Sequence, residues 1–415
     1  MRILVFPGGS FANLGDTAML LAALARMKEL WPEAHFELLT NEAVWLTECV
    51  PGCAPVPLRG AKRWLRVRAL PKFLFPKIPP RARDAFPLAP SRFWRLGGWL
   101  YPPDFRDARE FANALFGADL CVLAGCGLIN DEFAFAAMRA LDIFDVAIRG
   151  GVPTAMLGQG FGPVQNAALA RRAREVLPQV GLLLLRERLA GPGLLKQFGV
   201  PEGKIVVTGD DAVEMSFRER PSVPGNRIGV NLRLAAYSGL EEKIVETVRS
   251  VVAKKTRLWQ TDATGIPILI AGANSDSQTV ERLLENPAKE EKIPRGSAAL
   301  VQVIRRVGKC RIVVTGSYHA GVFALAQGIP VVTIARTNYY RGKFDGLAGQ
   351  FGAGCCVLAA DDGHFTEKLD AAMERAWNEA DLLRPRLLQA AEAQVRAARD
   401  AYYKLPGLMA GGSQF

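Results

Sequence analysis

Histidine is the scarcest acid–base side chain in this sequence, since only three histidines, at positions 35, 319 and 364, occur among 415 residues. Motifs of metal centres are also missing: there is no HExxH stretch, no cysteine–histidine cluster and no paired-aspartate motif. Zinc and other structural or catalytic metals are normally held by such sets of ligands. We therefore expect a protein without a bound metal.

Long apolar runs and paired cysteines are absent as well. No apolar run approaches the ~20 residues of a membrane-spanning helix. The opening stretch MRILVFPGGS has only a short apolar core before Pro7, which predicts a buried strand rather than a signal peptide. Seven cysteines, an odd number without CxxC spacing, predict buried free thiols and a reducing, cytoplasmic location. The alternative is a role as metal ligands or redox groups, for which two pairs are spaced closely enough: Cys49 with Cys53, and Cys355 with Cys356.

Acidic residues are nearly missing from one segment, residues 55–103. It holds eleven lysines and arginines but one acid, Asp84, and so carries almost all of the net charge of +11. Aromatic residues and prolines are interleaved with these basic residues, a pattern that suits a polyanion or an anionic membrane surface. A solvated insertion that folds over the body, anchored by its aromatics, is the alternative. Nucleic acid is the less favoured partner, because no recognition module accompanies the charge.

The rest of the chain alternates short apolar runs with amphipathic helical patterns, which predicts parallel sheets covered by helices. We expect an α/β protein with two doubly wound Rossmann-like domains and a cleft between them. Strands are expected at RILVF, HFELLT, DLCVLAG, PTAMLGQG, GLLLLRE, KIVVTGD, RIGVNLRL, IPILIAGA, RIVVTG and IPVVTIA. The predicted divisions are an amino-terminal domain at 1–217 that includes the basic insertion, a linker at 218–227, a second domain at 228–362, and a carboxy-terminal helix and tail at 363–415.

Ligands of such folds bind at the carboxyl ends of the strands, so the first loop to consider is GGSFANLGDTAML. Its glycines, Gly8, Gly9 and Gly15, permit close backbone approach, and the following helix offers free N–H groups to an anion. Asp16 has two interpretations. It is the obvious helix N-cap, or it is a carboxylate at the floor of the cleft that accepts a hydroxyl proton.

His319 lies where a strand becomes a buried helix, in TGSYHAGVFALAQG. The helix dipole lowers the pKa of a histidine at this position, and a bound multivalent anion would raise the pKa again. His319 is therefore a candidate proton donor or acceptor. A capping or hydrogen-bonded structural histidine is the alternative.

Basic side chains follow three other strands. Arg186 ends LLLLRE, Arg233 ends GVNLR, and Lys343 lies beyond the strand at 329–335. Gln159 is the functional side chain of the glycine-rich loop LGQGFGP, whose glycines also fit tight turns. Arginine and lysine gathered around one cleft would suit a small anionic substrate with phosphate or carboxylate groups.

Eight stretches in series resemble the polysaccharide pyruvyl transferase family over roughly residues 1–360. They are NLGDTAML, DLCVLAGCGLIND, LGQGFGP, LLLRERLAGPGLLKQFGV, VVTGDDAVEM, VNLR, TGSYHAGVFALAQGIPVV and KFDGL. Two positions depart from the family's pattern: Ser317 replaces an arginine and Glu187 replaces an aspartate. Arg336 and Arg341 are the candidates to restore the missing arginine's charge.

The resemblance implies a fold like that of the GT-B glycosyltransferases and transfer of pyruvate from phosphoenolpyruvate to two hydroxyls of a sugar, as a ketal, in cell-surface polysaccharide synthesis. It makes His319 the general acid and Asp16 a base or acceptor-orienting group. Arg186 and Lys343 would hold the donor's phosphate and carboxylate, with Arg233 a weaker candidate. Asn13, Gly15 and Gln159 are expected to contribute to substrate binding.

The same resemblance implies no cofactor beyond the donor substrate, and a sugar or lipid-linked oligosaccharide as acceptor. Segment 55–103 is not a motif of the family, but its basic and aromatic residues could dock the protein at the cytoplasmic face of the inner membrane, where a lipid-linked acceptor would be found. Two other functions stay open. One is a GT-B glycosyltransferase that uses a nucleotide sugar, and the other is a non-catalytic protein that binds membranes or polyanions. The oligomeric state is not specified by these patterns.

Overall fold

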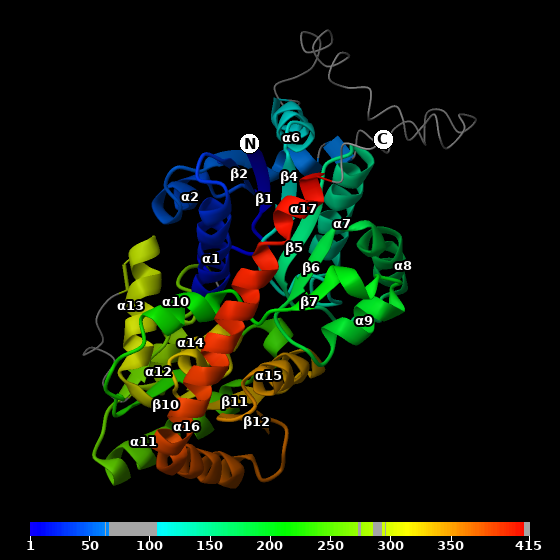
Figure 1. Ribbon diagram of the computed structural model, residues 1–415. Coiled ribbons are helices and arrows are strands. Elements are labelled where there is room, and N and C mark those ends of the chain that lie inside the picture. Colours follow the sequence, from blue (N-terminus) through cyan, green and yellow to red (C-terminus); the bar gives the residue numbers. More distant parts are fainter. Residues whose placement is uncertain (63, 66–105, 273–274, 285–292, 295, 411–415) are drawn as a thin grey trace.

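The computed structural model describes residues 1–415 except 63, 66–105, 273–274, 285–292, 295 and 411–415. Two parallel sheets, one in each half of the chain, confirm the predicted α/β class (Figure 1). Most of the predicted segment 55–103 lies outside the described residues. Among the described residues, no helix has both the length and the apolar character that crossing a bilayer requires.

The amino-terminal sheet has the order β3-β2-β1-β4-β5-β6-β7 among the described residues, and its paired strands are parallel. Its central strands are short and buried along almost their whole length, because helices cover both faces. The strands are β1 (Arg2–Phe6), β2 (His35–Thr40), β3 (Ala54–Pro57), β4 (Leu120–Leu123), β5 (Thr154–Gln159), β6 (Leu182–Leu185) and β7 (Ile205–Val207).

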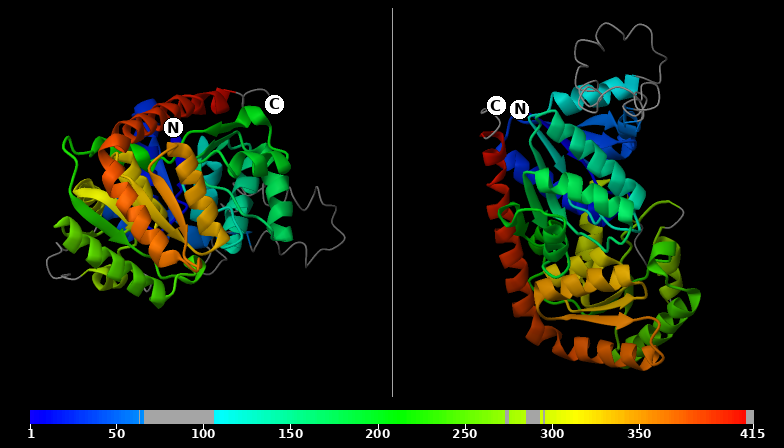
Figure 2. Two further views of the ribbon diagram at one scale, coloured as in Figure 1. Left: turned by 90° about the horizontal axis from the view of Figure 1, so that it is seen from below. Right: turned by 90° about the vertical axis from the view of Figure 1, so that its right-hand side faces the viewer.

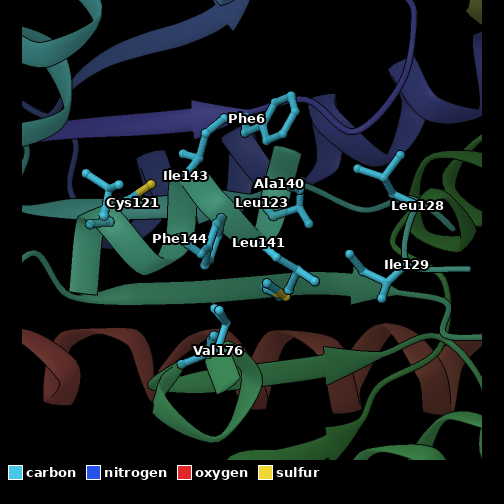
Figure 3. Close-up of a cluster of buried hydrophobic side chains, with 14 of the residues drawn as sticks. Phe6, Cys121, Leu123, Leu128, Ile129, Ala140, Leu141, Ile143, Phe144 and Val176 are labelled. Carbon is cyan, nitrogen blue, oxygen red and sulfur yellow. The ribbon is translucent and has the colours of Figure 1, made fainter. Parts of the chain in front are cut away.

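Helices on the two faces of this sheet bury separate apolar clusters. In one of them, shown in Figure 3, Ile143 and Phe144 pack with Phe6 and Leu123 of the strands. The helices of this half are α1 (Leu14–Leu30), α2 (Ala43–Cys49), α6 (Arg106–Phe116), α7 (Ala134–Arg149), α8 (Ala167–Val176) and α9 (Gly191–Gln197).

The second sheet is also parallel, with the order β12-β11-β10-β8-β9 among the described residues. Its strands are β8 (Arg227–Asn231), β9 (Ala263–Gly265), β10 (Cys310–Thr315), β11 (Val331–Ala335) and β12 (Cys355–Ala359). Its helices are α11 (Glu242–Trp259), α12 (Ser277–Leu283), α13 (Ser297–Gly308), α14 (Tyr318–Ala326) and α15 (Asn338–Phe351).

In each sheet the order of the strands changes direction once, and the candidate site lies near these two switch points. In the first sheet the reversal falls between β1 and β4, and in the second between β8 and β10. Crevices form at such switch points, beyond the carboxyl ends of the strands. The loop after β1 leads into α1, which carries Asp16 in its first turn, the loop after β8 carries Arg233, and β10 leads into α14, which carries His319. The topology thus places three of the predicted site residues at switch points.

Two helices connect the halves. In α10 (Ala212–Arg218), the Ser216 hydroxyl donates to the carbonyl oxygen of Phe323 in α14 over 2.8 Å. The long α16 (Phe365–Tyr402) packs Leu369 against the second sheet and Tyr402 against the first, so it runs along both halves (Figure 2). A short α17 (Leu405–Ala410) follows. The predicted linker at 218–227 falls between α10 and β8.

Three local predictions need correction. The strand expected at IPILIAGA is wrong: β9 lies just before it, and the run instead crosses to the first half, where the Leu14 amide donates to Ile268 and the Ile270 amide donates to Ala12. Residues 55–57 of the expected insertion belong to the edge strand β3. All seven cysteines are free, as predicted, although three of them are only partly buried.

Candidate functional site

The first turn of α1 brings the loop after β1 into the site. Asn13, not Asp16, is the N-cap, and its side-chain oxygen accepts a hydrogen bond from the Gly15 amide over 3.1 Å. The N-cap interpretation of Asp16 is therefore wrong, and its carboxylate is left within the first helical turn. Asp16 packs against Gly9 so closely that a Cβ at that glycine would lie 2.0 Å from Oδ2.

His319 lies in the first turn of α14, and 6% of its surface is exposed. Its ring packs on α1, since a Cβ built at Gly15 would lie 2.0 Å from both Cγ and Nδ1. Nε2 is 3.4 Å from the Met19 sulfur, also on α1. The start of one half's first helix and the start of a helix from the other half are thus in direct contact, with the imidazole between them.

A cavity of about 530 Å³ is lined by Tyr318, the residue before His319, whereas His319 and Asp16 are not among its lining residues. Arg186, at the end of β6, and Lys343, in α15, both line it. The Arg186 guanidinium lies 4.2 Å from the centroid of the Tyr318 ring, and Lys343 Nζ donates to the Tyr339 hydroxyl over 2.8 Å. Both cations are therefore held by aromatic neighbours at one wall of the cavity, where an anion can meet them together.

Glycines give Arg186 the space that it occupies. A Cβ at Gly127 would lie 2.7 Å from a guanidinium nitrogen, and one at Gly160 would lie 2.6 Å from Nε. The glycines of the stretches DLCVLAGCGLIND and LGQGFGP therefore serve the close approach of a charged side chain, in addition to any turn that they form.

Asp210 is a member of the site that the sequence analysis missed. It follows β7 and is 4% exposed. Its Oδ2 lies 3.7 Å from Nη1 of Arg186 and 3.8 Å from Nε2 of His319. The stretch KIVVTGD was expected as a strand, but β7 is only partly buried and two residues separate it from Asp210, so this signal is weaker than the one that identified Arg186 directly after the buried β6.

Two predicted binding residues have other partners. Arg233 makes a two-point ion pair with Asp276, with distances of 3.0 and 2.9 Å. The Gln159 amide nitrogen donates to three backbone carbonyls, and its oxygen accepts from the Cys126 thiol. Gln159 thus braces the loop after β4, and its predicted contact with substrate stays a prediction.

The arginines proposed to replace the charge lost at Ser317 point elsewhere. Arg341 pairs with Asp361, and Arg336 pairs with Glu241. Neither lines the cavity. The charge of Arg233, although paired, still acts on Asp16, His319 and Lys343.

Burial and mutual repulsion set the ionisation of the cluster. Burial, with the charges of Arg186, Lys343 and Arg233, lowers the pKa of His319 well below its usual value. Burial also raises the pKa of Asp16 to about 6, and burial with the charge of Arg186 lowers the pKa of Lys343 to about 7. Near pH 7 the imidazole is therefore neutral, and an added anion would raise its pKa by offsetting the charges of the neighbouring cations. Within the described part of the chain, no group of three or more potential ligands could hold a metal.

The two parallel sheets and the site between them define a class, the two-domain α/β proteins of the GT-B type. A candidate UDP-N-acetylglucosamine 2-epimerase from Listeria monocytogenes has the same fold, with a TM-score of 0.54, 14% identity, and coverage of 95% of this chain and 94% of that one. The UDP-GlcNAc 2-epimerase of Methanocaldococcus jannaschii gives 0.53 and 11%, covering 95% and 99%. The kitacinnamycin glycotransferase gives 0.52 and 12%, covering 98% of each chain.

The family is shown by the sequence. The model of the polysaccharide pyruvyl transferase family matches residues 13–338, so the chain belongs to that family. The match covers Asp16, Arg186 and His319 and ends just before Lys343. No curated protein matches the chain.

Proposed function

We propose that this protein transfers pyruvate from phosphoenolpyruvate to two hydroxyls of a sugar and forms a cyclic ketal. The observation that carries the proposal is the cavity wall that Arg186 and Lys343 share with Tyr318, whose ring lies 5.2 Å, centroid to centroid, from that of the buried His319. Phosphoenolpyruvate bears its phosphate ester and its carboxylate on the same carbon, and two neighbouring cations suit such a compact anion.

His319 supplies the acid in this proposal. Donor binding brings negative charge beside Arg186 and Lys343, the two lining cations that lower the pKa of the imidazole. The pKa of His319 then rises, and the imidazole takes up a proton. Protonation of the donor's methylene carbon makes the adjacent carbon electrophilic, and a sugar hydroxyl attacks it. Phosphate then leaves and the second hydroxyl closes the ring.

Asp16 is the proposed acceptor of a hydroxyl proton. Its carboxyl has a pKa of about 6, raised by burial, so it is mostly ionised near pH 7 and can act as a base. It lies on α1, beside the Gly15 backbone that packs on His319. An acid and a base on opposing elements fit a reaction that adds one proton to the donor and removes protons from two hydroxyls.

A nucleotide-sugar glycosyltransferase is the second candidate, because the kitacinnamycin glycotransferase shares the fold. The sugar or lipid-linked oligosaccharide acceptor, the cytoplasmic location and membrane contact through segment 55–103 also stay proposals. None of these three proposals is supported by the residues that line the cavity.

Isothermal titration distinguishes the two candidates. Wild type is titrated with phosphoenolpyruvate and, separately, with a uridine diphosphate sugar. The proposal expects saturable binding of phosphoenolpyruvate, weakened by about 2–5 kcal/mol when Arg186 is replaced by alanine. Arg341→Ala is the matched control, because Arg341 pairs with Asp361 outside the cavity lining. Binding of the nucleotide sugar alone would support the glycosyltransferase and overturn the pyruvyl donor.

A further inference from the structure

Asp210 occupies a position that the roles of His319, Arg186 and Lys343 leave unexplained. One oxygen, Oδ1, accepts a hydrogen bond from the Ala212 amide over 2.9 Å, which fixes the orientation of the carboxylate. The other, Oδ2, has no hydrogen-bond partner within the described residues, although it is buried. A buried carboxylate oxygen without a partner is costly, so native proteins rarely keep one without a function.

The free oxygen stands between two cationic or potentially cationic groups. Oδ2 is 3.7 Å from Nη1 of Arg186 on one side and 3.8 Å from Nε2 of His319 on the other. Both separations exceed the ~2.9 Å of a charge-assisted hydrogen bond. Oδ2 is thus shared between them and makes a full hydrogen bond to neither.

Charged groups on every neighbouring element act on this pair. Asp211 on the same loop and Asp16 on α1 disfavour ionisation of Asp210, whereas Arg186 favours it. Lys343 on α15 and Arg233 after β8, together with Arg186, disfavour a proton on His319. An anion bound at Arg186 would remove that constraint on His319 and would also compete with Asp210 for the guanidinium.

We propose that Asp210 is a positioning residue that acts through His319: its Oδ2 is a counter-ion of Arg186 before the donor binds and becomes the hydrogen-bond acceptor of protonated His319 afterwards. The inference rests on the proposed phosphoenolpyruvate site. The donor's anionic groups take the place of Asp210 at Arg186, and Oδ2 then serves His319.

The proton balance of this exchange is simple. On donor binding, the acid form of the buffer gives up one proton and becomes its conjugate base, and that proton forms a new bond to Nε2 and makes an imidazolium beside the Asp210 carboxylate. In the transfer step that N–H bond breaks and a C–H bond forms at the donor's methylene carbon. The electron pair of the broken bond stays on the imidazole, which returns to its neutral form.

Titration calorimetry in buffers of different ionisation enthalpy tests the exchange. Phosphoenolpyruvate binding to wild type should take up protons near pH 7 at His319 and, because the pKa of Lys343 is about 7, at Lys343 as well. Asp210→Asn should bind the donor and lose the share of the uptake that belongs to His319, while it keeps the share of Lys343. Asp361→Asn is the control carboxylate, because Asp361 pairs with Arg341 outside the cavity lining, and it should keep the full uptake. An equal loss in Asp361→Asn would show a general effect of charge and overturn the assignment to Asp210.

The scarcity of histidine permits a second readout. In a His35→Gln, His364→Gln background, His319 is the single histidine, so its ring nitrogens give one set of NMR signals. We expect a neutral ring without donor, a protonated ring with phosphoenolpyruvate, and a neutral ring with phosphoenolpyruvate in Asp210→Asn. Inorganic phosphate alone serves as a second anion.

The two proposals fail in different ways. If phosphoenolpyruvate does not bind at all, the proposed function fails and the inference falls with it. If it binds but His319 stays neutral in the protein with wild-type Asp210, the donor site stands and the exchange is overturned. This outcome does not depend on whether an Asp210 variant folds. If Asp210→Asn binds the donor and still protonates His319, Asp210 is not the partner. Asp210→Glu, which keeps the carboxylate, should recover part of the proton uptake.

Discussion

The ionisation of Lys343 should produce a clear pH dependence of the affinity for phosphoenolpyruvate. Its pKa is about 7, lowered first by burial and then by the charges of Arg186 and Arg233. The ammonium is present below this value and lost above it. The affinity for phosphoenolpyruvate should therefore fall as pH rises through about 7, by up to about tenfold per pH unit. Titration calorimetry from pH 6 to pH 9 measures this slope.

Lys343→Arg is the control for this prediction, because a guanidinium stays charged throughout the range. The ligand's own titration is the same for both proteins, so the difference between the two profiles isolates Lys343. Parallel profiles would contradict the assignment of the pH dependence to Lys343.

The site residues differ in how well the sequence predicted them, for a physical reason. Parallel strands bring their carboxyl ends to one edge, so a charged residue directly after an apolar run is a strong signal. Arg186 was found in this way, whereas Thr208 and Gly209 separate Asp210 from the end of β7 and weaken the signal there. Gln159 lies at such a position too, but its amide turns back to the carbonyl groups at the ends of the strands. Position along a strand does not reveal that direction.

At the scale of elements, the contact between α1 and α14 holds the site together. Gly15 leaves space for the imidazole, since a Cβ there would come within 2.0 Å of two ring atoms of His319. Both partners are helix starts anchored by their own sheets, so neither can withdraw easily. The ring would have to move from its place beside Asp210.

Gly15→Ala should therefore abolish most of the activity while leaving the protein folded. The substitution favours α1 by helix propensity, by up to about 1 kcal/mol, so a loss of activity cannot be attributed to a weaker helix. Initial rates of phosphate release measure the effect. Gly193→Ala is the control, because that glycine lines the cavity beside Arg186 and Lys343 and a Cβ there meets nothing within 4 Å. Equal effects of the two substitutions would contradict the packing argument.

The order of helices and strands was largely predictable from the sequence. The exceptions show where an apolar run does not by itself predict a strand. Apolar runs bounded by turn residues correctly indicated β1, β4 and β10. The run IPILIAGA has the same pattern, yet it forms no strand of the second sheet, because Ile266 and Ile268 are buried in a cluster with α1, α13 and α14. Burial between the two halves produces the same sequence pattern as burial within a sheet. Local sequence cannot separate them.

At the scale of the whole molecule, α16 and α10 make the two halves interdependent. Arg26 of α1 pairs with Asp211 and with Glu214 of α10. The Tyr402 hydroxyl of α16 donates to Asp211 over 3.1 Å, and the Arg26 guanidinium lies 5.0 Å from the centroid of the Tyr402 ring. This buried cluster ties one end of α16 to the first half, while Leu369 near the other end belongs to the core of the second.

Tyr402→Ala should therefore uncouple the halves as well as destabilise the protein. Loss of a fully buried aromatic ring costs about 3–5 kcal/mol, and here it also leaves Asp211 without one of its donors. Calorimetry should show one unfolding transition for wild type and two for the variant, because α16 no longer clamps the first sheet. Tyr403→Ala is the matched control, since the side chain of Tyr403, the next residue in the chain, is 68% exposed. A single transition in Tyr402→Ala, merely shifted to lower temperature, would mean that α10 and the backbone bridge between the Asn13 loop and Leu269 suffice to keep the halves cooperative.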